Sequence, residues 1–137
     1  MASSSTAAHP ADTQKNKKLV TDFFSLAFVE KKIQEAVNTY VGDAYIQHNP
    51  NLPDGKEPLI GFLSKIFLQE NPQISVSIKR VIAEGDLVVV HHHSKNSPED
   101  PGQAIVEIFR VKNGKIVEHW DVFQNVPETS ANENTMF

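Results

Sequence analysis

Apolar residues recur at helical spacing in the first half of the chain and at strand spacing in the second. Steps of three and four run through residues 15–28, 33–40 and 59–67, which predicts three helices. The first two are separated by a break near Glu30. From Ile74 onward apolar and polar residues alternate, which is typical of half-buried strands. The predicted strands follow Ile74 and then cover residues 87–94, 104–111 and 115–123.

Turn signals join these strands in sequence. Glu84-Gly85-Asp86 fits a tight turn, and Asn113-Gly114 is a strong hairpin signal because both positions tolerate positive φ. A short extended segment is also expected at residues 45–50, between the second and third helices. Helices followed by a meander of strands predict an α+β fold, with three N-terminal helices packed on one face of a strongly curved antiparallel sheet.

Length and charge narrow the class of protein. A chain of 137 residues predicts a single domain over residues 15–125, after a disordered leader at 1–14 and before a polar tail at 126–137. The net charge is −4 and no basic run exceeds two residues, which argues against a nucleic-acid partner. Apolar runs are too short to cross a membrane, and the start does not resemble a signal peptide, so we expect a cytoplasmic protein.

Cysteine is absent, so disulfides, a thiolate nucleophile and Cys-ligated metals are excluded. Histidines and carboxylates remain as candidate chemistry. His91 and His93 share one face of their strand, Glu107 lies on the next, and His119 and Asp121 share a face of the last. Polar groups that recur on apolar strand faces fit either a core with satisfied polar groups or a ligand pocket.

Two sharper hypotheses follow from these residues. Asp121 and His119 form a plausible acid–base pair, because an apolar wall raises the basicity of a carboxylate and a nearby histidine can hold the proton. Alternatively, His91 and His93 with His48 or His119 could supply three imidazoles to a zinc ion. Trp120, the only tryptophan, fits a pocket wall or a subunit interface.

Several motifs resemble the SnoaL-like group of the nuclear transport factor 2-like superfamily. They are YIQHNP at 45–50, IFRV at 108–111 and NGKIVEHWDV at 113–122. The ending, VPETSAN at 126–132 and NTMF at 134–137, resembles a branch assigned to aldol condensation. The resemblance implies a cone-shaped α+β barrel around a deep apolar pocket, a homodimer packed through the sheet, and acid–base chemistry without a cofactor.

The resemblance also implies roles for individual residues. Asp121 matches the general base with His119 beside it, and His48 matches the histidine of the H-N-P motif. Glu107 stands where this branch often has aspartate. We expect the pocket to be lined by His91, His93, Glu107, Tyr45, Trp120 and Phe109. The implied function is an aldol-type cyclase, isomerase or lyase acting on a small carbonyl or polyketide-like compound; the alternative is a non-catalytic small-molecule binding protein on the same scaffold.

Overall fold

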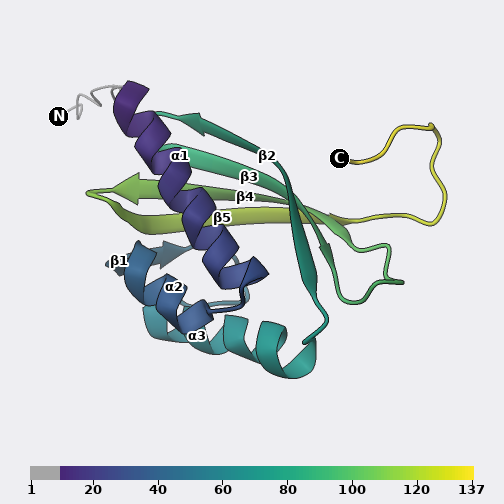
Figure 1. The fold of residues 1–137 in the computed structure, drawn as a ribbon, viewed down its shortest axis with the longest axis horizontal. Coiled ribbons are helices and arrows are strands. Elements are labelled where there is room, and N and C mark those ends of the chain that lie inside the picture. The colour runs from purple at the N-terminus through teal and green to yellow at the C-terminus, as the bar shows by residue number, and fades with distance from the viewer. Residues whose placement is uncertain (1–9) are drawn as a thin grey trace.

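The computed structural model describes residues 10–137 and consists of a helical layer lying against one face of a five-stranded sheet (Figure 1). The predicted α+β class is confirmed. The helices are α1 (Pro10–Phe24), α2 (Ile33–Tyr40) and α3 (Lys56–Ser64). The strands are β1 (Val41–Gln47), β2 (Ser75–Glu84), β3 (Leu87–Lys95), β4 (Gln103–Lys112) and β5 (Lys115–Asn125).

Two of the helices end in wider π-helical turns. Ser25–Val29 (η1) continues α1, and Lys65–Glu70 (η2) continues α3. The first helical segment ends after η1, and Lys31 there has a φ of 60°. Helix α1 begins at Pro10, so the last five residues of the expected leader are helical rather than disordered. Proline is well suited to a first helical turn, since its missing N–H would have no partner there. The rest of the leader lies outside the described residues.

The sheet has the order β1-β5-β4-β3-β2. Strands β2 to β5 form the predicted antiparallel meander. Strand β1, which includes part of the expected extended segment, instead pairs parallel with β5. The sheet is therefore mixed: its four long strands form the predicted antiparallel sheet, and β1 adds a parallel edge strand. Because β1 and β2 remain as two edges, the cone is open and no closed barrel forms.

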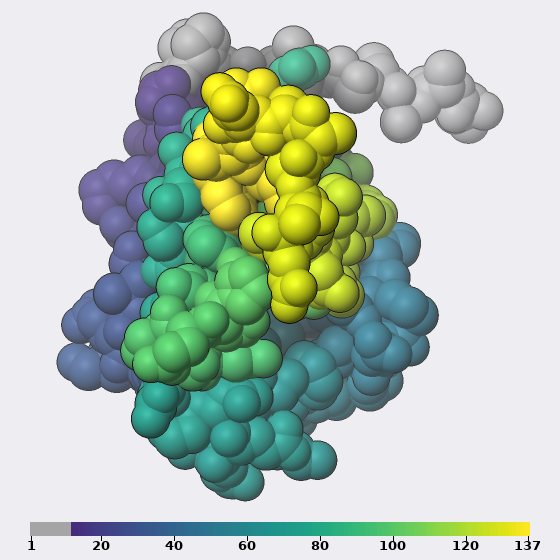
Figure 2. All heavy atoms as spheres, turned by 90° about the vertical axis from the view of Figure 1, so that its right-hand side faces the viewer, coloured from purple at the N-terminus to yellow at the C-terminus, as the bar shows by residue number. Residues whose placement is uncertain are grey.

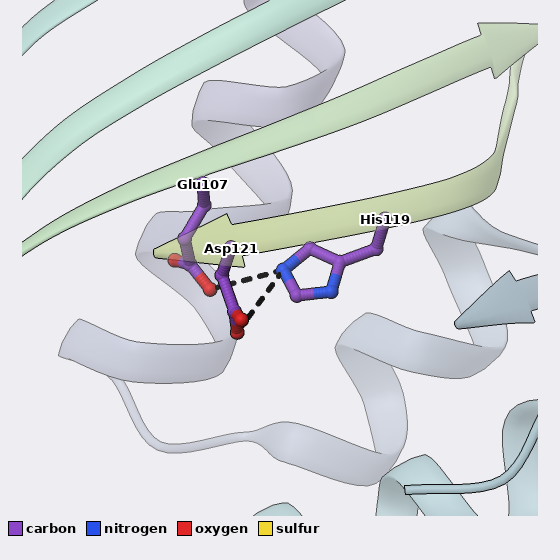
Figure 3. A group of neighbouring side chains, drawn as sticks. All are labelled: Glu107, His119 and Asp121. Atoms are coloured by element: carbon purple, nitrogen blue, oxygen red, sulfur yellow. Dashed lines mark hydrogen bonds and ion pairs between the residues drawn. The ribbon is translucent and has the colours of Figure 1, made fainter. Parts of the chain in front are cut away.

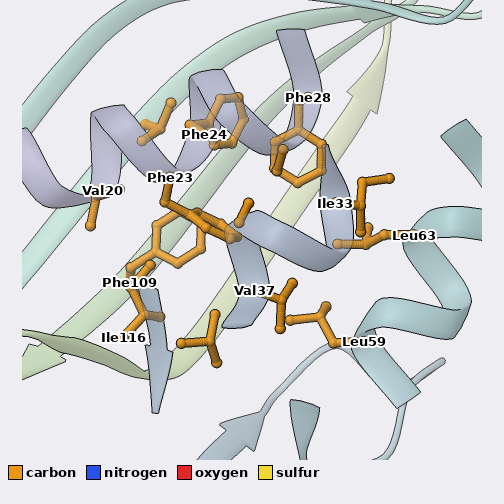
Figure 4. Close-up of a cluster of buried hydrophobic side chains, with 14 of the residues drawn as sticks. Val20, Phe23, Phe24, Phe28, Ile33, Val37, Leu59, Leu63, Phe109 and Ile116 are labelled. Atoms are coloured by element: carbon orange, nitrogen blue, oxygen red, sulfur yellow. The ribbon is translucent and has the colours of Figure 1, made fainter. Parts of the chain in front are cut away.

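The core lies between the helices and the concave face of the sheet (Figure 4). The buried Phe28 ring of η1 contacts Phe23 and Phe24 of α1, and Phe23 in turn contacts Phe109 of β4. Burying such aromatic side chains contributes about 2–3 kcal/mol each, before ordering costs. Ile116 of β5 is fully buried as well, and a shift of register at this point pairs it with Val111. The aromatic side chains of α1 and η1 thus form the contact between the first helical segment and the sheet.

The tail from residue 126 onward has no regular structure and returns toward the outer face of the sheet (Figure 1). The Phe137 ring stacks on that of His93, with centroids 4.2 Å apart. In Figure 2 the tail, in yellow, lies beside the loop between β3 and β4. Among the helices of residues 10–137, none is long and apolar enough to span a membrane.

Candidate functional site

Strand pairing brings two carboxylates together on the inner face of the sheet. Val81, Val90, Glu107 and Asp121 lie directly opposite one another across the four antiparallel strands. The side chains of Glu107 and Asp121 retain only 14% and 12% of their exposure. His119 precedes Asp121 by two residues on β5, so its ring emerges on the same side (Figure 3). Antiparallel pairing therefore places three ionisable groups side by side.

Each carboxylate oxygen of Glu107 is hydrogen-bonded to a histidine ring. His92 Nε2 lies 3.0 Å from Oε2, and His119 Nε2 lies 3.2 Å from Oε1. Burial by itself raises the pKa of Glu107, but the hydrogen bonds from His119 and His92 outweigh burial and lower it to about 2. Glu107 is therefore an anion that accepts hydrogen bonds from both rings.

The other nitrogen of His119 fixes how many protons the group carries. Nδ1 lies 2.7 Å from Gln47 Oε1, which also accepts the backbone N–H of Asn49 at 3.0 Å. This oxygen is an acceptor, so Nδ1 must carry a hydrogen. The contact between Nε2 and the Glu107 carboxylate, at 3.2 Å, then requires a second hydrogen between these two groups. The His119–Glu107 pair thus holds one proton more than a neutral imidazole beside a carboxylate.

Asp121 is held from the opposite side by Asn49. The Asn49 side-chain Nδ2 donates to both oxygens of Asp121, at 3.0 Å each. Asn49 is itself buried, and its Oδ1 accepts the backbone N–H of Asn51 at 2.9 Å. His119 Nε2 lies 3.9 Å from Asp121 Oδ2. The Asp121 carboxylate is therefore oriented next to the hydrogen between His119 Nε2 and Glu107.

These groups line a cavity with two compartments, of about 420 and 850 Å³ with their open mouths included. Both compartments share Asn49, Glu107 and Asp121 with an apolar wall of Phe28, Phe62 and Leu63. The smaller is further lined by Phe23, Tyr45, Gln47, Leu52, Leu59, Phe109 and His119. The larger adds His92, Asn51, several apolar side chains, and a polar end formed by Ser94, Asn96 and Gln103.

Tyr45 contributes a neutral hydroxyl to the smaller compartment. Burial, and next the negative charge of Glu107, raise the pKa of Tyr45 well above its ordinary value. Its oxygen accepts a hydrogen bond from Gln47 Nε2 at 3.2 Å. The phenol therefore keeps its proton at neutral pH, and that proton is suited to donation toward a ligand oxygen.

Of the residues singled out from the sequence, the structure brings five to the cavity: Tyr45, Glu107, Phe109, His119 and Asp121. It does not bring His48 or Trp120 there. The His48 ring stacks on Trp120 with centroids 4.7 Å apart, and its Nε2 pairs with Glu118 at 2.7 Å. The chain turns so that Gln47 and Asn49 point inward while His48 points outward.

His91 and His93 also lie away from the cavity, which corrects their expected place in its lining. His91 contacts Arg80, and His93 Nε2 donates to the carbonyl of Pro101 at 2.7 Å. Their intervening neighbour His92 faces inward instead. The imidazole trio expected for zinc is therefore not assembled. In the described part of the chain, the group that could ligate a metal is Glu107, His119 and Asp121, whose ligand atoms lie within 4.8 Å of one another.

Sequence reasoning missed three residues of the site: Gln47, Asn49 and His92. Alternation correctly separated His92 from its two neighbours, but no feature of β3 shows which face meets the helices. Gln47 and Asn49 flank the histidine of the H-N-P motif. An inward–outward alternation through this motif would have selected them in place of His48.

Solved structures of low sequence identity share this fold. A candidate SnoaL-like polyketide cyclase from a Jannaschia species is 18% identical, with a TM-score of 0.71, over 85% of this chain and 90% of that one. A candidate ketosteroid isomerase from Kribbella flavida is 16% identical, with a TM-score of 0.70, over 88% and 86%. An epoxide hydrolase from M. tuberculosis is 18% identical, with a TM-score of 0.65, over 82% and 85%.

Such identities establish the likeness of the fold alone, and the sequence matches no curated protein. The sequence itself carries stronger evidence of descent. Residues 20–119 match the model of the SnoaL-like domain, which covers most of the chain and includes Asn49, Glu107 and His119 of the site but not Asp121. The chain therefore belongs to the SnoaL-like domain family.

Proposed function

We propose that this protein is a cofactor-independent acid–base enzyme, an aldol-type cyclase, isomerase or lyase that acts on a small carbonyl or polyketide-like compound. One observation carries the proposal: an oriented carboxylate, Asp121, lies 3.9 Å from a histidine nitrogen that shares a proton with Glu107. All three groups line the smaller compartment. A base and a proton donor that face one cavity are the minimum requirement for proton transfer to and from a carbonyl compound.

The two carboxylates differ in the role they can take. Glu107 is a poor proton acceptor, because its pKa of about 2 reflects hydrogen bonds to both of its oxygens. Asp121 receives its hydrogen bonds from the neutral amide of Asn49. Asp121 is therefore the base that removes a proton from the carbon next to the carbonyl group.

Proton removal sends the C–H electron pair onto the carbonyl oxygen and forms an enolate. The Tyr45 hydroxyl donates a hydrogen bond to this oxygen, where negative charge develops. In a cyclase or aldol reaction the enolate carbon attacks a second carbonyl, and the His119–Glu107 pair gives its proton to the new alkoxide. Asp121 then returns its proton to the pair, so that the site is regenerated. In an isomerase the proton from Asp121 is delivered to another carbon.

The test is exchange of α-hydrogens for deuterium in ketone probes, followed by NMR in D₂O. This assay reports the first chemical step without knowledge of the natural substrate. We expect the full chain to accelerate exchange, and Asp121→Asn to reduce the rate by about 10²–10⁴-fold because the shape is kept and the base is lost. Asp43→Asn is the matched control, since Asp43 is fully exposed and pairs with Lys56.

Full exchange activity in Asp121→Asn would exclude Asp121 as the base. Ketones that bind to the wild-type protein without any acceleration of exchange would instead support the non-catalytic binding protein. Probe binding is therefore measured in parallel by ligand-observed NMR, on the wild type and on both variants.

A further inference from the structure

The charged side chains that line the cavity are acidic. Glu107 and Asp121 belong to both compartments, whereas no lysine or arginine of the described residues 10–137 lines either of them. The remaining ionisable side chains of the lining are Tyr45, His92 and His119. The wall thus contains two acidic groups and no permanently cationic group.

Basic groups near the cavity are engaged elsewhere. Lys95, adjacent to Ser94 of the polar end, donates to the carbonyl of Pro98 at 2.9 Å. Arg110, adjacent to Phe109, pairs with Asp86 at 2.8 Å and with Glu118 at 3.0 Å. Neither is available to neutralise an anion bound against Asp121.

Proton counting gives the net charge of the site. His92 donates Nε2–H to Glu107, and its buried Nδ1 has no partner, so a second proton there would be an unsatisfied donor. Two carboxylates therefore face at most one additional proton, because His119 has an acceptor at each ring nitrogen whereas His92 does not. A net negative charge remains beside the position where Asp121 meets the ligand.

The far end of the larger compartment is polar but neutral. Ser94, Asn96 and Gln103 offer amide and hydroxyl groups that can hydrogen-bond to a ligand hydroxyl or carbonyl without a charge partner. Ile105 lies between Gln103 and Glu107 on the inner face of β4, and Phe123 follows Asp121 on β5; both apolar side chains line the larger compartment. The cavity is thus polar at both ends and apolar between them.

We propose that this cavity selects uncharged substrates. The preferred ligand carries a carbonyl group toward Asp121 and His119, an apolar body, and a second neutral oxygen group toward Ser94 and Asn96. Carboxylates and phosphate esters of the same size are rejected, because like charges a few ångströms apart repel strongly where water is partly excluded. This inference names the substrate class of the proposed enzyme, but the charge selectivity itself requires only binding.

The experiment uses two ketones of similar size, 4-(hydroxymethyl)acetophenone and the anion 4-acetylbenzoate, titrated into the full chain and followed by NMR. We expect the neutral ketone to bind on the order of a hundredfold more tightly than the carboxylate. In Asp121→Asn the difference should shrink by about tenfold, chiefly through tighter binding of the anion. Asp43→Asn, which removes the same charge far from the cavity, should leave the difference unchanged.

Equal affinities for the two ketones in the wild type would overturn the proposal, as would binding of neither at millimolar concentration. A difference that persists in full in Asp121→Asn would also overturn it, because the selectivity would then arise from shape. The exchange assay of the proposed function gives a result that is independent of this binding titration. A protein that binds only the neutral ketone but exchanges none of its α-hydrogens would retain the charge selectivity and lose the proposed catalysis.

Discussion

Asn49 donates its side-chain amide to both carboxylate oxygens of Asp121, at 3.0 Å each, across 72 residues of chain. The bond joins the turn after β1 to the middle of β5. It lies at the wall common to both compartments. The turn between β1 and α3 thus orients a carboxylate on β5, the strand with which β1 pairs in parallel.

Removal of this amide should lower both stability and proton transfer. Asn49→Ala leaves a buried carboxylate with fewer donors, so we expect a loss of about 1–3 kcal/mol in the free energy of unfolding. Misplacement of the base should slow α-hydrogen exchange by about ten- to a hundredfold. Urea titration and deuterium exchange measure the two effects. Asn38→Ala, at an exposed position of α2, should change neither.

The ionisation of Glu107 should make the free energy of unfolding depend on pH. Its folded-state pKa of about 2 lies below the ordinary 4.5, so its stabilising contribution is present above about pH 4.5 and is lost as the pH falls toward 2. Glu107→Gln should therefore be less stable than the wild type by a few kcal/mol at pH 6, and the difference should narrow at pH 3. Urea unfolding at both values tests this. A constant difference, or the same narrowing in Glu57→Gln on the exposed side of α3, would contradict it.

Two glycines with positive φ offer a matched pair for the loop at the polar end of the cavity. A Cβ on Gly102, at φ +82°, would lie 2.3 Å from the carbonyl oxygen of Ser94, whereas one on Gly85, at φ +60°, meets no atom within 4 Å. Gly85→Ala should cost about 1–2 kcal/mol from the backbone alone. Gly102→Ala should cost several kcal/mol because the loop must also move. Equal losses in thermal unfolding would show that the loop accommodates the methyl group freely.

The homodimer expected from the sequence remains a proposal, and the outer face of the sheet supplies its test. Ile82, Val89, Ile108 and Trp120 lie opposite one another across four strands, and Ile82 is 57% exposed. Light scattering at micromolar concentration should give a dimer for the wild type and a monomer for Ile108→Lys. Gln34→Lys, on the exposed side of α2, should remain dimeric. A monomeric wild type would refute the proposal.

The sequence by itself determined the elements and their order. Helical and strand periodicities are local, since they follow from side-chain spacing within one segment, and the turns at Gly85 and Gly114 could be identified for the same reason. Alternation also sufficed to place Glu107 with Phe109, and His119 with Asp121. The relative grouping of residues on one strand needs no knowledge of the rest of the molecule.

Tertiary structure alone decided which of the two faces became the cavity. On β3 the alternative faces begin with equally apolar residues, Leu87 and Val89 against Val88 and Val90, so composition could not select between them. Packing of the Phe24 ring of α1 against His92 buried this histidine beside Val88 and Val90 and left its two neighbours outside. The parallel pairing of β1 with β5 is equally non-local. This pairing fixes the direction of the side chains that follow β1. Asn49 rather than His48 therefore points toward Asp121.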